Sequence, residues 1–216
     1  MFRYVLAPIN ADAARALSLP RTLPTSTGVA ITFDDGPHPE GTPAILEHLA
    51  AACAKATFFL IGEQVERRPE LAARIVAEGH HVGLHGHRHR LQSRLSAKAA
   101  ADDLQHGIEV ITQAIGTAPT LHRPPYGIYS PAGLRAARTA GLQPLLWSRW
   151  GKDWRKFTTP GRIARRATRA LIGGDVILLH DADFYSAKHC HRHTVEALGP
   201  ILTELERRKL DTVLAV

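Results

Sequence analysis

Short apolar runs alternate with amphipathic stretches along this chain, and that alternation limits the folds it can adopt. Runs rich in β-branched, aromatic and other apolar residues predict strands at residues 29–33, 56–60, 81–84, 120–123, 142–147, 176–179 and 212–216. Helical periodicity lies between most of them, at residues 42–52, 69–78, 97–115, 131–140, 160–172 and 194–208. Strands that alternate with helices form a parallel sheet. The sequence therefore predicts an α/β fold with seven strands, either a barrel that lacks one unit or an open doubly wound sheet.

The domain organisation expected from the sequence is simple. Residues 29–216 are long enough for one α/β domain with a sizeable core, and we expect residues 1–28 to form an extension that packs on it. Hydrophobic residues make up 44% and charged residues 22% of the chain, which is ordinary for a globular protein. No apolar run is long enough for a secretory signal or a membrane span. We therefore expect a soluble, cytoplasmic protein, unless an export signal has been removed.

Ionisable side chains lie at or just after the ends of several predicted strands. Two adjacent carboxylates end the first strand, and the others follow the third, fourth, fifth and sixth predicted strands: Asp34, Asp35, His85, Arg123, Asp153 and His180. In a barrel, the carboxyl ends of all strands meet at one face, which is where active sites of this architecture lie. We therefore expect these six side chains to converge.

The segment GLHGHRHR places histidines at positions 85, 87 and 89. If the strand continues, all three share a face; if the chain turns helically after His85, then His85 and His89 converge. One carboxylate with two imidazoles is a common zinc ligand set that leaves a position open for water. A cation would also offset the repulsion between Asp34 and Asp35. These residues predict a metal site.

A second histidine-rich segment, KHCHRH at residues 188–193, looks like a metal cluster, but its spacing fits no standard zinc pattern. We expect a loop or the start of a helix there. His38 is expected at the surface, and His87 is expected to be exposed or to support the site rather than to bind the metal. Trp147 and Trp150 have aromatic faces that suit an apolar ring surface of a ligand, although Trp147, at a strand end, is equally suited to the core.

The net charge of +7 comes from 27 lysines and arginines against 20 acidic residues, and arginine is densest in RIARRATRA at residues 162–170. Such a run indicates either attraction to an anionic polymer or surface, or a solvated helix face. No nucleic-acid-binding motif accompanies the charge, so we do not expect a nucleic-acid partner. Peripheral contact with an anionic surface stays open, and the sequence does not indicate an oligomeric state.

Six motifs, in order, resemble those of the polysaccharide deacetylases of carbohydrate esterase family 4. They are TFDDGP at 32–37, ATFFLIG at 56–62, HVGLHGHRH at 81–89, RPPYG at 123–127, DW at 153–154 and ILLHD at 177–181. That family includes chitin, chitooligosaccharide and peptidoglycan N-deacetylases, and the resemblance covers residues 28 to 216. It implies a distorted seven-stranded (β/α) barrel similar to a TIM barrel, in agreement with the strand count.

The resemblance also implies roles for the residues around the metal. Asp35, His85 and His89 would bind the metal, with Zn²⁺ as the first expectation and Co²⁺ or another divalent ion as the alternative. Asp34 would act as the catalytic base, and Arg123 would orient it.

The remaining motifs imply an acid and a substrate groove. His180 would be the general acid, and Asp153 would hold either Arg123 or this acid in place. The backbone N–H of Tyr126 would help to form an oxyanion hole. The substrate-binding residues implied by the resemblance are Tyr126, Pro125, Trp154 and Leu178, the last as a wall against the acetyl methyl group.

The chain departs from the family pattern at Leu84 and Gly86, where Asn and Ser or Thr are usual, and around Trp150, where preceding acidic residues are missing. The expected function is metal-dependent removal of N-acetyl groups from amino sugars of a glycan or glycoconjugate. Two alternatives remain: an amidohydrolase of the same fold that acts on a small amide or imide, and a non-catalytic carbohydrate-binding relative. The sequence does not say which N-acetylated substrate is used, or whether it is a polymer, an oligomer or lipid-linked.

Overall fold

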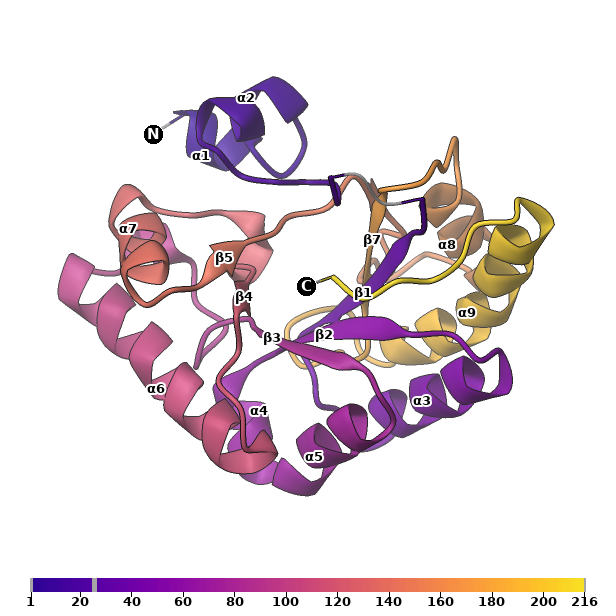
Figure 1. Ribbon diagram of the computed structural model, residues 1–216, viewed down its shortest axis with the longest axis horizontal. Coiled ribbons are helices and arrows are strands. Elements are labelled where there is room, and N and C mark those ends of the chain that lie inside the picture. Colours follow the sequence, from indigo (N-terminus) through magenta and orange to yellow (C-terminus); the bar gives the residue numbers. More distant parts are fainter. Residues whose placement is uncertain (1, 25–26, 216) are drawn as a thin grey trace.

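The computed structural model describes residues 2–24 and 27–215, and a parallel sheet curled into a half-barrel lies at its centre (Figure 1). Its strands are β1 (Ala30–Asp34), β2 (Ala56–Leu60), β3 (His81–Leu84), β4 (Leu121–His122), β5 (Gln143–Pro144), β6 (Arg149–Trp150) and β7 (Val176–His180). The spatial order is β5-β4-β3-β2-β1-β7-β6. Consecutive strands are neighbours except β5 and β6, which form the two open edges, and β7 pairs with β1. The chain therefore runs around the barrel in one direction and never reverses as in a doubly wound sheet. The predicted barrel-like α/β fold is confirmed.

Helices cover the outside of the curled sheet (Figure 1). They are α3 (Gly41–Ala51), α4 (Gly62–Arg67), α5 (Pro69–Ala77), α6 (Ala97–Ile115), α7 (Pro131–Thr139), α8 (Pro160–Ala167) and α9 (Cys190–Arg207). Every residue of β1 and β2 is buried, which explains their continuous apolar sequences: both faces of a parallel sheet are covered. Within the described part of the chain, no helix is long and apolar enough to span a membrane.

The strand count of seven is right, but one predicted member is wrong. Over residues 212–215 the chain forms only a single bridge, Val29 to Thr212, and residue 216 lies outside the described part. The missing member is β6, a two-residue strand that pairs with β7. The predicted strand at 142–147 shrinks to β5 because Leu146 turns away and donates its backbone N–H to Pro20. Asp153 therefore follows β6, and His180 ends β7.

Helix boundaries differ mainly near the C-terminal half. α8 ends at Ala167 rather than at residue 172, and α9 begins at Cys190, four residues earlier than predicted. The KHCHRH segment thus leads into the first turn of a helix, as expected. Three helices were not predicted: α1 (Phe2–Leu6), α2 (Ala11–Ala16) and α4.

The N-terminal segment crosses the side of the barrel where β5 and β6 are not paired (Figure 1). Pro20 accepts the Leu146 N–H on the β5 side, and Thr22 bridges to Asp175 just before β7. Between them, Arg21 donates from Nε to the carbonyl oxygen of Trp147 at 2.8 Å. The segment thus ties the two edges of the open barrel together and supports Trp147 from behind.

Candidate active site

A pocket of about 240 Å³ opens at the carboxyl ends of the strands. Its lining combines acidic, imidazole and aromatic side chains: Asp34, Asp35, His85, His89, Tyr126, Gly127, Trp147, Trp150, Trp154, Leu178, His180, Tyr185 and Ser186. Carboxylates and histidines that are far apart in the sequence therefore meet at the face expected for a barrel.

Asp35, His85 and His89 form a compact group whose ligand atoms all lie within 4.8 Å of one another. Asp35 Oδ1 is 3.5 Å from His85 Nε2 and 3.4 Å from His89 Nε2. This oxygen is buried and has no hydrogen-bond partner. His87, between the two imidazoles in sequence, stays outside the group; it is buried rather than exposed, and its ring stacks on His106 at 4.0 Å.

Local backbone geometry brings these three side chains together. Asp35 has a φ of 81°, a left-handed conformation that is strained for a residue with a side chain. Gly86 has a φ of 93°, so the chain turns directly after His85 and brings His89 back to the site. Glycine at 86, a departure from the usual family residue, suits this turn because it has no Cβ to strain.

The donor set fits a divalent metal ion. His85 Nδ1 donates to the carbonyl oxygen of Arg123 at 2.7 Å, so its proton is on Nδ1 and the lone pair on Nε2 faces Asp35. Burial lowers the pKa of His89 to about 4, so this imidazole is neutral at pH 7. Burial raises the pKa of Asp35, but the imidazoles of His85, His180 and His89 outweigh that effect and bring it down to about 2. One carboxylate and two imidazoles match a zinc site with an open position.

Asp34 has a different partner from Asp35. Its Oδ1 accepts a 2.7 Å hydrogen bond from Arg123 Nη1, which also donates to Thr32 Oγ1 at 2.8 Å. The guanidinium is fully buried, donates further to the carbonyl oxygens of Leu145 and Leu146, and lies 4.0 Å from the centre of the Phe59 ring. Every face of Arg123 is thus engaged, and the side chain holds Asp34 in one orientation.

Asp153 holds His180 and does not contact Arg123, which decides between the two alternatives left open by the sequence. Its Oδ1 accepts from His180 Nδ1 at 2.9 Å, and its Oδ2 accepts from the His180 backbone N–H and from Thr194 Oγ1. Burial lowers the pKa of His180, but the Asp153 charge and hydrogen bond outweigh it, with smaller help from Asp35, and raise it to about 10. His180 is therefore a charged imidazolium at neutral pH.

Aromatic side chains form the pocket wall on the side of His180. The rings of Trp147, Trp150 and Trp154 follow one another with centroids 5.9 and 5.6 Å apart, and Trp154 meets His180 edge-on at 5.4 Å. Trp147 is almost fully buried and forms the back of the wall, so it is both a core residue and a pocket residue. Leu178, on β7, lies beside them.

Tyr126 lines the pocket beside His89, with ring centroids 4.7 Å apart. Its side chain is 56% exposed, and its backbone has a φ of 61° within the 3₁₀ turn η2 (Pro125–Gly127). Among the described residues, no acceptor takes the Tyr126 backbone N–H. Pro125 is buried in the same turn and does not line the pocket, in contrast to its expected role in substrate binding.

Three residues of the site were not found by sequence reasoning. Tyr185 stacks on His89, Ser186 lines the pocket beside it, and Thr32 links Arg123 to the sheet by donating to the Ile177 carbonyl oxygen. Tyr185 and Ser186 lie in the loop between β7 and α9, where no periodic signal exists. Thr32 carried one available signal: a hydroxyl inside an apolar strand needs a buried polar partner.

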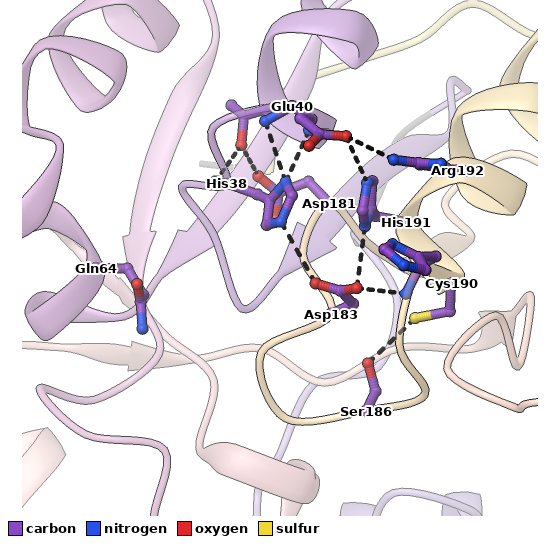
Figure 2. Close-up of polar contacts among 12 residues, drawn as sticks. His38, Glu40, Gln64, Asp181, Asp183, Ser186, Cys190, His191 and Arg192 are labelled. Carbon is purple, nitrogen blue, oxygen red and sulfur yellow. Dashed lines mark hydrogen bonds and ion pairs between the residues drawn. The ribbon is translucent and has the colours of Figure 1, made fainter.

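A second group of imidazoles and carboxylates lies at the start of α9 (Figure 2). His38 and His191 flank Asp183, with nitrogen–oxygen distances of 3.4 and 3.3 Å, and their ring centroids are 4.2 Å apart. His38 is buried rather than at the surface, because the early start of α9 places His191 against it.

This second group has the composition of a metal site but not the required lone pairs. His38 Nδ1 accepts backbone N–H groups from Gly41 at 2.9 Å and Glu40 at 3.2 Å. Its proton is therefore on Nε2, the nitrogen that faces Asp183. Burial lowers the pKa of His38 to about 4, so the ring is neutral and has no second lone pair to offer. Asp183 also accepts the His189 backbone N–H, and the group fixes the loop that carries Tyr185.

Comparison with known proteins shows the family of this chain and agrees with its fold. The polysaccharide deacetylase family matches over residues 24–145, and the chain belongs to this family. It is 37% identical over 182 residues to a peptidoglycan-N-acetylglucosamine deacetylase of Bacillus cereus, covering 83% of this chain and 82% of that one. A chitooligosaccharide deacetylase of Bradyrhizobium is also 37% identical, with 83% and 85% covered.

A solved structure supports the same family and fold. The peptidoglycan N-acetylglucosamine deacetylase Bc1960, in complex with 4-naphthalen-1-yl-N-oxidanyl-benzamide, superimposes with a TM-score of 0.85 at 29% identity. The match covers 93% of each chain. The resemblance seen in the six motifs is thereby confirmed for the family and for the fold.

Proposed function

We propose that this protein is a divalent-metal-dependent hydrolase that removes N-acetyl groups from amino sugars of a glycan. The observation that carries the proposal is that groups suited to act as a base, as an acid and as metal ligands line the same pocket. Asp34, bonded to a buried arginine, and His180, bonded to a buried carboxylate, line the same pocket as the Asp35–His85–His89 group. Membership of the polysaccharide deacetylase family and the names of the two relatives support the same activity.

Asp34 is the base in this proposal. A divalent ion held by Asp35, His85 and His89 would supply Lewis acidity and a lowered pKa for water. Asp34 removes a proton from the water that adds to the amide carbonyl carbon. Arg123 keeps the Asp34 carboxylate in position and, with its four bonds satisfied by protein groups, has no freedom to leave it.

His180 is the acid. The amine can leave only when its nitrogen takes up a proton, and an imidazolium with a pKa of about 10 carries that proton throughout the neutral range. Asp153 keeps the ring in one orientation. When the C–N bond breaks, the products are acetate and the free amino sugar, and His180 is left neutral until it regains a proton from solvent.

The remaining pocket residues suit an N-acetylated sugar. The unpaired backbone N–H of Tyr126 can donate to the oxygen of the carbonyl that is attacked. Leu178 offers an apolar surface for a methyl group, and Trp150 and Trp154 offer faces to the C–H surface of a pyranose ring. This wall favours a sugar over a small amide or imide.

Acetate release from a panel of N-acetylated glycans, with and without added Zn²⁺ or Co²⁺, tests the proposal. We expect release from at least one glycan, its loss after chelation and its recovery on metal addition. Asp34→Asn is the matched inactive control, since it removes the base and keeps the shape of the side chain. Hydrolysis of small amides or imides without acetate release from any glycan would contradict the proposal.

A further inference from the structure

The positive charge of this protein is concentrated in one segment. Residues 149–170 contain eight lysines and arginines and a single carboxylate, Asp153, an excess of seven. The whole chain has a net charge of +7, so the rest of the sequence is balanced. The segment runs from β6 through the loop that carries Asp153 and Trp154 and then forms α8. We call it the basic segment.

The cations of α8 and of the turn that follows it form one exposed stripe. Arg162 and Arg165, three residues apart, lie on one face of α8, and Arg169 lies in the turn just after the helix ends at Ala167; all three are exposed. The opposite face, with Ile163 and Ala167, is buried in the protein. The stripe is therefore a charged surface whose apolar side is already covered.

Seven of the eight cations of the basic segment have no carboxylate partner in the described part of the chain. Across residues 2–24 and 27–215, no ion pair involves any lysine or arginine between residues 152 and 169. The eighth, Arg149, pairs with Asp175, and outside the segment Arg207 and Arg208 pair with Glu204. A group of like charges without counter-charges repels itself, and an anionic partner would relieve that repulsion.

The basic segment begins at the wall of the pocket. Lys152 Nζ lies 4.4 Å from the ring centre of Trp150, which lines the pocket. Burial together with the charges of Arg155 and Arg166 lowers the pKa of Lys152, so these three cations are close neighbours. Positive charge is thus continuous from the pocket wall to α8. One extended ligand could occupy the pocket and the basic segment together.

From this continuity we infer that the basic segment docks a glycan that carries carboxylates along its length, and that such a glycan is preferred over a neutral chain. The inference rests on the proposed function and specifies its substrate class. A peptidoglycan strand, with an acidic peptide on alternate sugars, has this chemistry; a chitin oligomer does not. A lipid surface fits less well, because the apolar face of α8 is buried and only its charges are available.

The test compares two N-acetylated substrates of equal length, a soluble peptidoglycan strand with free peptide carboxylates and a chitin oligomer. The variant replaces Arg162, Arg165 and Arg169 with glutamine, which keeps helix propensity and removes three charges. We expect the KM for the peptidoglycan strand to rise about tenfold, the low end of electrostatic steering effects, with kcat unchanged. Both constants for the chitin oligomer should stay unchanged. High salt should reproduce the effect of the variant on the wild-type protein.

A matched control replaces Arg3, Arg94 and Arg135 with glutamine. These arginines are also exposed but lie on α1, on the 3₁₀ turn η1 (Gln92–Arg94) and on α7. Figure 1 shows α1 and α7 on the other side of the molecule from α8. An equal KM rise in the control, or equal KM values of the wild type for both substrates, would overturn the inference. The inference would also be overturned if anionic phospholipid vesicles or RNA bound tightly to the protein without affecting its binding of the peptidoglycan strand.

Two readouts separate this inference from the proposed function. Acetate release from the neutral oligomer reports the catalytic site alone, because it does not depend on the basic segment. Sedimentation of the Asp34→Asn variant with insoluble peptidoglycan reports docking alone, because it does not depend on turnover. Binding there should weaken when Arg162, Arg165 and Arg169 are also replaced, and unchanged binding would overturn the docking surface even in a fully active enzyme.

Discussion

Tyr185 lies flat against His89, with ring centroids 4.3 Å apart and ring planes 8° from parallel. The phenol hydroxyl donates to Glu63 Oε1 at 2.7 Å and accepts from Gln64 Nε2 at 2.9 Å, both on α4. The ring is therefore fixed from one side by α4 and presses on the imidazole from the other. In the proposed function, Tyr185 acts through His89 and is a positioning residue for the metal.

Replacing Tyr185 should weaken metal binding according to how much of the ring remains. We expect Tyr185→Ala to lower metal affinity by about 10- to 100-fold, the range seen when groups that support a ligand are removed. Tyr185→Phe keeps the stacked ring and should keep most of the affinity. Metal titration of both variants checks this, with Phe157→Ala as a control because that ring is 83% exposed. Equal losses in the Ala and Phe variants would assign the effect to the hydroxyl and contradict the stacking.

Alanine variants of the three histidines of GLHGHRHR should differ in their metal content. We expect His85→Ala and His89→Ala to lose both stoichiometric metal and activity, because each removes one of the three donors of the Asp35–His85–His89 group. His87→Ala should keep its metal, because its ring faces His106 instead. Metal analysis of the three purified proteins decides the matter, and loss of metal only from the His87 variant would reverse the assignment.

Replacement of the histidines of the KHCHRH segment should lower the stability of the protein and leave its metal binding unchanged. Replacing His189, Cys190, His191 and His193 together is expected to leave occupancy of the catalytic site unchanged. Because His191 is buried against His38 and Asp183, the same variant should melt at a lower temperature. Metal analysis and thermal unfolding of one preparation check both parts. A catalytic metal bound by any of these four residues in a crystal structure would disprove the first.

The sequence could predict the elements of the site that lie at strand ends. Asp34, His85, Arg123 and His180 each end or directly follow a strand, and the carboxyl ends of parallel strands must meet whatever the details of packing. Their convergence thus depends only on element type and order. The same reasoning gave the length of α6 from its helical period and its glycine stop at Gly116, which has a φ of 76°.

The sequence could not predict features that depend on contacts across the fold. β6 has two residues and exists because β7 offers it an edge, while the more apolar stretch around Leu146 is held by Pro20 instead. Tyr185 reaches His89 only because its loop is fixed by Asp183 and by α4. Contacts of this kind produce no periodic pattern in the sequence.

The pairing of His180 with Asp153 predicts a pH dependence of stability. The pKa of His180 in the folded protein, about 10, lies above the value of about 6.5 expected in the unfolded chain. The pair therefore contributes its full stabilisation below pH 6.5 and loses it as the pH rises towards 10. The stability difference between wild type and Asp153→Asn should shrink over that range, as measured by denaturant unfolding at several pH values. A difference that grows with pH would contradict the pairing.

The same variant should change the pH profile of catalysis. Without the Asp153 charge the pKa of His180 falls, so the acid loses its proton at a lower pH. We expect the alkaline limb of kcat/KM to move to lower pH in Asp153→Asn, with a loss of up to about 10²- to 10⁴-fold where the acid is no longer protonated. Profiles of kcat/KM against pH for both proteins check this. An alkaline limb at the same pH in both would exclude His180 as the acid.

The adjacent carboxylates Asp34 and Asp35 should have separable functions, because neighbouring residues face different partners. Asp34 is bonded to Arg123, and Asp35 points its unpartnered Oδ1 at two imidazoles. Asp34→Asn should therefore keep its metal and lose about 10²- to 10⁴-fold in kcat as a base is removed. Asp35→Asn should bind metal more weakly and regain part of its activity in excess metal. Metal titration followed by acetate release at saturating metal distinguishes them, with thermal unfolding to show that both variants are folded. Loss of metal from the Asp34 variant, together with its retention in the Asp35 variant, would exchange the two roles.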